Sequence, residues 1–217
     1  MINALNVLLQ LRWESRAILG IILRKGPLTK GDILDKSKMK LSTLNRVMQP
    51  LMAKGLIVES SIGDSTGGRK PVLYDVNPKD YYLIGIDISR TYTQMVVTNL
   101  RTDVLYKKHF LMDESSTPQQ IVHLISEFVR DVLHRLSINK DAIIGIGIGT
   151  VGPLDRIKGK MLNPRSFLSE GWNNVSIRNM VEDITGLPVT IDNGANTAIL
   201  AELIHGAGKG FNNIVYI

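Results

Sequence analysis

The stretch from Pro27 to Pro71 constrains the fold of this 217-residue chain more than any other. It contains two short amphipathic segments joined by a tight turn, followed by a glycine-marked basic segment between two apolar runs. This order of parts is typical of a winged helix-turn-helix, in which one helix braces against the DNA backbone and a second enters the major groove. The stretch therefore predicts a DNA-binding module; the alternative is a helical hairpin that only packs.

Three helices are expected in this region. The first covers residues 11–25, with apolar side chains at helical spacing: Trp13, Ala17, Ile18, Ile21 and Ile22. Thr29 is a suitable N-cap for the second helix, and residues 37–40 supply the turn. The third helix begins near Ser42, and Pro50 predicts a kink in it because proline removes a backbone hydrogen bond.

The third helix has an apolar and a polar face. Its apolar positions follow the spacing of a buried stripe: Leu44, Val47, Met48, Leu51 and Met52. The polar face supplies candidate contacts to bases and phosphates: Ser42, Thr43, Asn45, Arg46 and Gln49. Thr29, at the start of the second helix, is a further candidate DNA contact.

A wing is expected after these helices. Residues 56–58 and 72–76 predict two strands, and the two glycines between them permit a tight turn. Arg69 and Lys70 follow these glycines and place two positive charges where a phosphate or a minor groove could be met. The alternative for this pair is a solvated turn.

Charge is distributed unevenly along the chain. Residues 1–82 hold 13 Lys and Arg against 7 Asp and Glu, whereas residues 83–217 hold 13 of each kind. The excess positive charge therefore lies with the predicted DNA-binding module, which favours nucleic acid as its partner. The absence of cysteine excludes disulfides and thiolate ligands, and the four histidines are isolated, so no metal site is expected. We expect a cytoplasmic protein with neither signal peptide nor membrane span.

The remainder of the chain predicts a second, α/β domain. Residues 77–80 are expected to form a linker, which divides the chain into a winged helix-turn-helix domain at 1–77 and a second domain at 82–217. The pattern predicts strands at 82–88, 94–98, 104–110, 143–149 and 188–191. It predicts helices at 117–136, 175–185 and 195–205.

Five stretches resemble the ROK family of bacterial repressors and sugar kinases. They are GGRKPVLYDVNP, LIGIDISRTYTQMVVTNL, IGIGIGTVGPLD, the Trp172-Asn173 region and LPVTIDNGANTAILAELIHGAGKGFNNIVYI. The resemblance implies an actin-like, hexokinase-like (ribonuclease-H-like) ATPase-fold lobe after the winged helix-turn-helix. Because full-length members continue into a second half-domain, the chain is expected to be truncated, with this lobe incomplete at its C-terminus.

The chain departs from the sugar-kinase members of the family at the position of the catalytic base. In those kinases, an asparagine that binds the sugar is followed by an aspartate that removes the proton; the corresponding residues here are Asn193 and Gly194. Glycine cannot act as a general base. Asp192 is one residue early and should point elsewhere, because side chains alternate along a strand. Asn193 stays a candidate sugar ligand, although it is equally suited to cap the following helix.

The resemblance places a second departure in the phosphate loop. The kinases have aspartate, glycine and threonine at alternate positions, and this chain has Asp87, Ser89 and Thr91. Ser89 replaces the glycine that lets backbone approach a phosphate closely, so this is a degenerate phosphate loop and ATP binding is not expected.

Together these features predict a DNA-binding repressor of a carbohydrate-utilisation operon, controlled by a monosaccharide effector, without cofactor or catalytic residue. Since members of the family act as dimers or tetramers, a homodimer or higher homo-oligomer on a palindromic, double-stranded operator is implied. The alternatives are a sugar kinase and a fragment that dimerises with a longer partner. The sugar stays open, because regulators of xylose, glucose and N-acetylglucosamine share these motifs.

Overall fold

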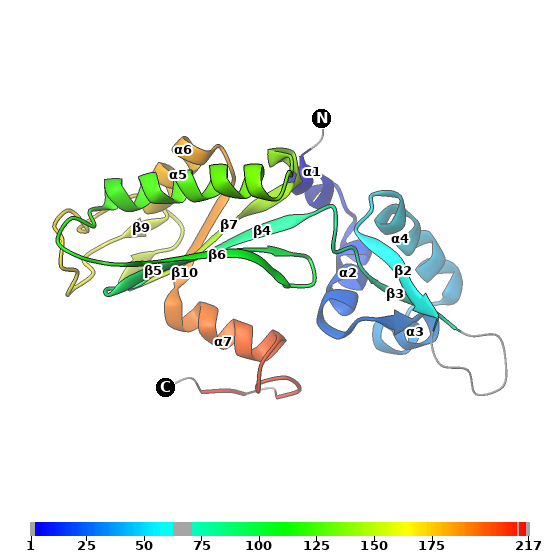
Figure 1. Cartoon of the computed structure of the whole chain (residues 1–217). Helices are drawn as coiled ribbons and strands as arrows, with labels where there is room; N and C mark the ends of the chain where they lie inside the picture. The colour runs from blue at the N-terminus through cyan, green and yellow to red at the C-terminus, as the bar shows by residue number, and fades with distance from the viewer. Residues whose placement is uncertain (1–2, 63–70, 212, 216–217) are drawn as a thin grey trace. The chain divides into compact units, whose positions relative to one another are not determined.

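Figure 1 shows a computed structural model of the chain, which describes residues 3–62, 71–211 and 213–215. The chain divides into two compact units. The first is Met1–Tyr81 together with Asn99–Asp103, and the second is Tyr82–Thr98 together with Val104–Ile217. No helix in the described residues is sufficiently long and apolar to span a bilayer.

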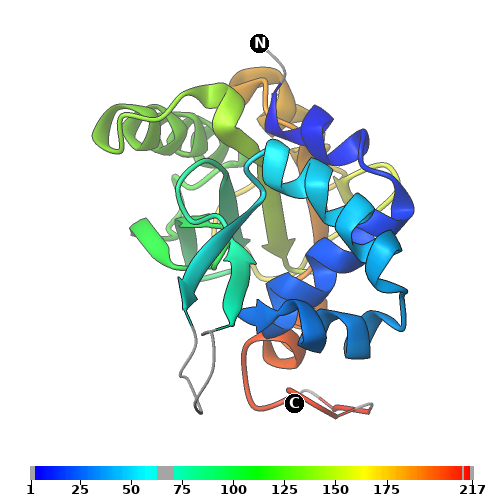
Figure 2. The ribbon, with the colours of Figure 1, turned by 90° about the vertical axis from the view of Figure 1, so that its right-hand side faces the viewer.

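The first unit is a winged helix-turn-helix, as predicted (Figure 2). Its helices are α1 (Ala4–Leu9), α2 (Trp13–Lys25), α3 (Lys30–Ser37) and α4 (Leu41–Ala53). Its antiparallel sheet has the order β1-β3-β2, with β1 (Leu28–Thr29), β2 (Ile57–Ile62) and β3 (Val72–Val76). The three predicted helices and the two wing strands are confirmed, whereas α1 and β1 were not predicted.

The buried stripe of α2 differs from the predicted one. Trp13 is 74% exposed and Ala17 is exposed as well, so both predictions were wrong. The buried positions are Ser15, Ile18, Leu19 and Ile22, which share one face of the helix. The polar Ser15 is tolerated there because its hydroxyl donates a hydrogen bond to the carbonyl oxygen of Val47 in α4, at 3.2 Å.

Helix α4 keeps most of its predicted stripe. Leu44, Val47, Met48 and Leu51 are buried, but Met52 is 41% exposed, which contradicts its predicted place in the core. Pro50 lies inside the helix, which continues to Ala53; the kink expected at Pro50 stays a prediction. The apolar face therefore ends one residue earlier than the sequence pattern indicated.

The segment predicted as a linker is fastened to the first unit. The side-chain amide of Asn77 donates to the carbonyl oxygen of Gly55 at 2.8 Å and to the carboxylate of Asp80 at 2.6 Å. The hydroxyl of Tyr81 donates to the carbonyl oxygen of Lys54 at 2.5 Å. These bonds hold residues 77–81 against the turn between α4 and β2, so the segment does not behave as a free linker.

The second unit is built on a five-stranded mixed sheet with the order β10-β7-β4-β5-β6. Its strands are β4 (Tyr82–Ile88), β5 (Tyr92–Asn99), β6 (Val104–Leu111), β7 (Ile143–Thr150) and β10 (Val189–Asn193). Strand β7 pairs in parallel with both β4 and β10, whereas β5 and β6 are antiparallel. A small hairpin, β8 (Leu154–Asp155) and β9 (Lys160–Met161), follows β7.

Helices cover the sheet of the second unit on both sides. Figure 1 shows α5 (Pro118–Arg135) and α6 (Ile177–Thr185) on one side and α7 (Gly194–Ile204) on the other. Thr117 caps α5 and Pro118 occupies its first turn, as the sequence predicted. The core lies between the sheet and the α5–α6 layer, where Phe128, Ile125 and Val132 are fully buried.

Candidate functional site

The first unit presents the predicted polar face on α4. Ser42, Asn45, Arg46 and Gln49 are exposed there, and Thr43 is half-buried. The predicted wing residues Arg69 and Lys70 lie outside the described residues. A groove of about 630 Å³ runs along α4, with Asn45, Arg46 and Gln49 among its lining side chains.

Two residues of this polar face are held by neighbouring helices. Arg46 forms an ion pair with Glu14 of α2, with 3.7 Å between the guanidinium nitrogen and the carboxylate oxygen. Asn45 accepts a hydrogen bond on its side-chain oxygen from the ammonium group of Lys30, at 3.1 Å. Neither Lys30 nor Glu14 was singled out from the sequence, and only the position of Lys30 directly after the N-cap could have suggested it.

Thr29 has a clear structural task. Its hydroxyl accepts a hydrogen bond from the backbone N–H of Asp32 at 3.1 Å and donates one to the Asp32 carboxylate at 2.6 Å. The same carboxylate accepts from the Thr29 backbone N–H, which completes a capping box at the start of α3. These hydrogen bonds from Thr29 hold the pKa of Asp32 below its usual range. The proposed DNA contact of Thr29 would have to share an engaged hydroxyl.

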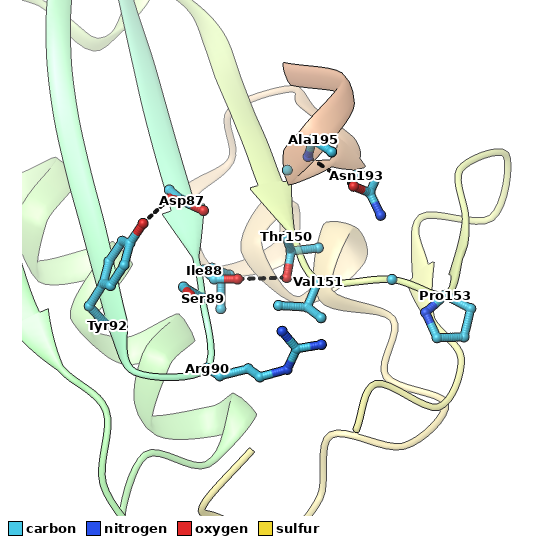
Figure 3. A pocket seen from close by; sticks show the side chains of 12 residues that line it. Asp87, Ile88, Ser89, Arg90, Tyr92, Thr150, Val151, Pro153, Asn193 and Ala195 are labelled. Carbon is cyan, nitrogen blue, oxygen red and sulfur yellow. Dashed lines mark hydrogen bonds between the residues drawn. The ribbon is translucent and has the colours of Figure 1, made fainter. Parts of the chain in front are cut away.

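The second unit contains a cavity of about 610 Å³ at the carboxyl ends of its parallel strands. Open α/β sheets commonly bind ligands at this edge. Figure 3 shows the lining side chains, which come from the turn after β4, the end of β7 and the start of α7. Among them are Asp87, Ser89, Arg90, Thr150, Asn193 and Gly194. The Thr150 hydroxyl donates to the carbonyl oxygen of Ile88 at 3.0 Å and ties two of these strand ends together.

The degenerate phosphate loop only partly reaches the cavity. Asp87 and Ser89 line it, whereas Thr91 is exposed and does not. The Asp87 carboxylate accepts a hydrogen bond from the hydroxyl of Tyr92, at 2.9 Å. Arg90 also lines the cavity, with its Nε donating to the carbonyl oxygen of Arg165 at 2.9 Å. Arg90 was not predicted, because the residue that holds it, Arg165, is 75 positions away in the sequence.

Asn193 caps α7 and borders the cavity at the same time. Its side-chain oxygen accepts from the backbone N–H of Ala195 at 2.9 Å, so the predicted capping role is confirmed. Its side-chain nitrogen has no hydrogen bond to any described residue and lies near Gly152. Gly194 lines the cavity without offering a side chain. A ligand could therefore accept a hydrogen bond from Asn193 but would meet no carboxylate at position 194.

Asp192 is committed to other partners and does not line the cavity. Its carboxylate accepts a hydrogen bond from the side-chain amide of Asn196 at 2.9 Å and pairs with the guanidinium of Arg156 at 3.0 Å. The hydrogen bond from Asn196 lowers the pKa of Asp192 below its usual range, assisted by the backbone N–H of Asn193 and by Arg156. A lowered pKa makes this carboxylate a poor proton acceptor.

We expect Asp192 to contribute to the acid sensitivity of the second unit. Because its pKa is lower in the folded state, its stabilisation is present above the unfolded value of about 3.9 and is lost as the pH falls through the folded value. Asp192→Asn should therefore flatten the decline in unfolding free energy below about pH 4. Urea unfolding over a series of pH values measures this. Asn196→Ala should have a smaller effect in the same direction. If the unfolding free energy declines identically below about pH 4 in wild type and both variants, the assignment is wrong.

Metal ligation has no support in the described part of the chain. No three His, Cys, Asp or Glu side chains there are grouped so that they could hold an ion.

Comparison with known proteins matches both units. The ROK family profile matches residues 83–217, and a profile described as winged helix-turn-helix DNA-binding matches residues 15–58. The xylose repressor of Bacillus spizizenii is 28% identical over 94% of this chain and 52% of its own length. The transcriptional dual regulator NagC of Escherichia coli is 22% identical over 98% of this chain and 51% of its own length. The chain thus spans about half the length of these curated relatives.

Among solved structures, a ROK family transcriptional regulator described as a homologue of the E. coli MLC protein shares this fold. It superposes with a TM-score of 0.67 and 21% identity, covering 90% of this chain and 49% of the regulator. The match spans both the winged helix-turn-helix and the sheet that contains the cavity. The predicted fold class, a winged helix-turn-helix followed by an α/β domain of the ROK family, is confirmed.

Proposed function

This chain belongs to the ROK family, and on that premise we propose that it is a DNA-binding transcriptional repressor of carbohydrate utilisation, controlled by a sugar effector. One observation carries the proposal. The same chain combines a winged helix-turn-helix, whose helix α4 has an exposed polar face, with a cavity where glycine occupies the position of the kinase base. The relatives named as a xylose repressor and as a DNA-binding transcriptional dual regulator support the proposal.

The proposal assigns DNA binding to residues 1–77 and effector binding to residues 82–217. The DNA contacts are Thr29, Ser42, Thr43, Asn45, Arg46, Gln49, Arg69 and Lys70. The effector ligand is Asn193, beside the degenerate phosphate loop of Asp87, Ser89 and Thr91. We further propose a cytoplasmic homodimer or higher homo-oligomer on a palindromic operator, because a symmetric dimer presents two identical recognition helices to two half-sites.

Effector control requires that the sugar bind two states of the protein unequally. A ligand with equal affinity for the DNA-binding state and the released state shifts neither population, however tightly it binds. The free side-chain nitrogen of Asn193 is the group that would recognise a sugar hydroxyl. Phosphoryl transfer is not part of the proposal, because Gly194 offers no base and the Asp192 carboxylate is held by Asn196 and Arg156.

The DNA-binding part is tested by Arg46→Ala. Binding sites are first selected from a random duplex library with the wild-type chain, and affinity is then measured by fluorescence anisotropy over a range of salt concentrations. Loss of the guanidinium should weaken binding by about tenfold, as expected for one arginine contact to a base or phosphate. If the contact is to a phosphate, the slope of log affinity against log salt concentration should also become shallower by about one.

Arg130→Ala is the matched control. It removes the same charge from an exposed position on α5 in the second unit. Its affinity for DNA should stay within about twofold of wild type, because the lost charge is not on the polar face of α4. Unchanged affinity in Arg46→Ala would refute the assignment of α4 as the recognition helix.

A further inference from the structure

Lys30 lies where three elements of the first unit meet. It is the first residue of α3, its ammonium group donates to the side-chain oxygen of Asn45 on α4, and the same group lies 5.6 Å from the ring centre of Tyr74 on β3. Tyr74 is itself buried, and its hydroxyl donates to the carboxylate of Glu59 on β2 at 3.3 Å. The ammonium group is therefore positioned from two sides, by an amide oxygen and by an aromatic face.

This contact determines which end of the Asn45 amide is free. An ammonium group has three donors and no acceptor, so only the oxygen of the amide can face it. The amide nitrogen of Asn45 must then point away from Lys30, on a side chain that is exposed on the polar face of α4. Asn45 therefore offers hydrogen-bond donors outward, while one of the two lone pairs of its oxygen already accepts from a cation.

The orientation matters for base recognition in the major groove. Asparagine reads adenine by a bidentate contact, in which its oxygen accepts from N6 and its nitrogen donates to N7. The second lone pair of the oxygen can still accept from N6, but that amino group would then lie beside the Lys30 ammonium group, donor against donor, which disfavours adenine. Asn45 suits edges that present acceptors, namely O6 and N7 of guanine or O4 of thymine. The Lys30 ammonium group lines the same groove along α4 and adds further donors.

We propose that Lys30 is a specificity-determining residue, which makes Asn45 read an acceptor edge, guanine or thymine, in place of adenine. The inference rests on the proposed DNA binding through α4 and adds the residue that sets its base preference. Lys30 acts here as a positioning residue for Asn45, in addition to any contact of its own with the DNA.

The test is binding-site selection from a random duplex library by the full chain and four variants: Asn45→Ala, Lys30→Met, Lys30→Arg and Lys36→Met. Asn45→Ala identifies the base position that depends on Asn45, because its preference is lost there. At that position wild type should prefer guanine or thymine. Lys30→Met, which keeps the aliphatic stem but removes the donor, should shift the preference toward adenine by about tenfold, the discrimination expected of one bidentate contact.

Two variants separate this role from charge or folding. Lys30→Arg keeps a group that can only donate, so it should retain the wild-type preference. Lys36→Met removes the same charge from an exposed position in the last turn of α3 and should leave the preference unchanged. An unchanged preference in Lys30→Met would overturn the inference and leave the proposed function standing. Failure of wild type to select any site would overturn both.

Discussion

Replacing Phe128 with alanine should destabilise the second unit by about 3–5 kcal/mol. Phe128 is 0% exposed on α5, and its ring stacks on that of Tyr106 in β6 with 5.6 Å between the ring centres. The substitution removes both the apolar transfer energy and the stacking contact, and leaves a cavity between helix and sheet that close-packed neighbours refill only in part.

Tryptophan fluorescence can follow this loss in the second unit. Trp172 is 3% exposed there, whereas Trp13 of the first unit is 74% exposed and can be changed to phenylalanine to give a single reporter. Urea unfolding of Phe128→Ala in that background should show the lowered midpoint. His123→Ala, on the exposed side of the same helix, should change stability by no more than about 0.5 kcal/mol. Equal effects of the two variants would contradict the placement of α5 on the sheet.

Among the described residues, the cavity offers a hydrogen-bond donor but no carboxylate at the position of the kinase base. A general base typically contributes about 10² to 10⁴-fold in rate, and position 194 has no side chain to supply one. The neighbouring carboxylate of Asp192 is held by Asn196 and Arg156, so it cannot substitute without breaking both contacts. Asn193, in contrast, keeps a free donor beside the cavity. These features support the proposed role of the cavity as an effector site.

Local signals in the sequence explain why most elements could be predicted. The capping box of Thr29 and Asp32 and the cap of Thr117 before Pro118 define helix starts by hydrogen bonds within a few residues. Helix α1 was missed because six residues are too few to show a periodic pattern. The exposure of Trp13 was missed for a related reason, since the burial of Ser15 depends on a partner in α4.

The candidate sites were predictable only where a motif marks them. The resemblance to the ROK family indicated Asp87, Ser89 and Asn193, all of which line the cavity. Arg90 and Lys30 could not be predicted, because their partners, Arg165 and Asn45, are distant in sequence and become neighbours only in the fold. Side chains that hold another residue in position leave no periodic or compositional signal.

Leu44→Ala should destabilise the first unit by about 2–5 kcal/mol. Leu44 is 0% exposed on α4, directly before Asn45, and it packs the helix that carries the polar face against the core. For a small domain with a stability of about 5 kcal/mol, this loss raises the unfolded fraction from about 0.02% to between about 0.6% and 50%. The apparent DNA association constant scales with the folded fraction, because only the folded unit binds, so it should fall by at most about twofold. Hydrogen exchange of α2 and α4 amides should accelerate in parallel.

Met52→Ala on the same helix distinguishes the structure from the sequence pattern. The periodic stripe places Met52 in the core with Leu44, whereas the structure leaves it 41% exposed beside the groove along α4. Its replacement should therefore cost less than about 1 kcal/mol and leave amide exchange in α4 nearly unchanged. Equal costs at the two positions would mean that α4 is rotated or longer than described, which would also move Asn45 away from Lys30.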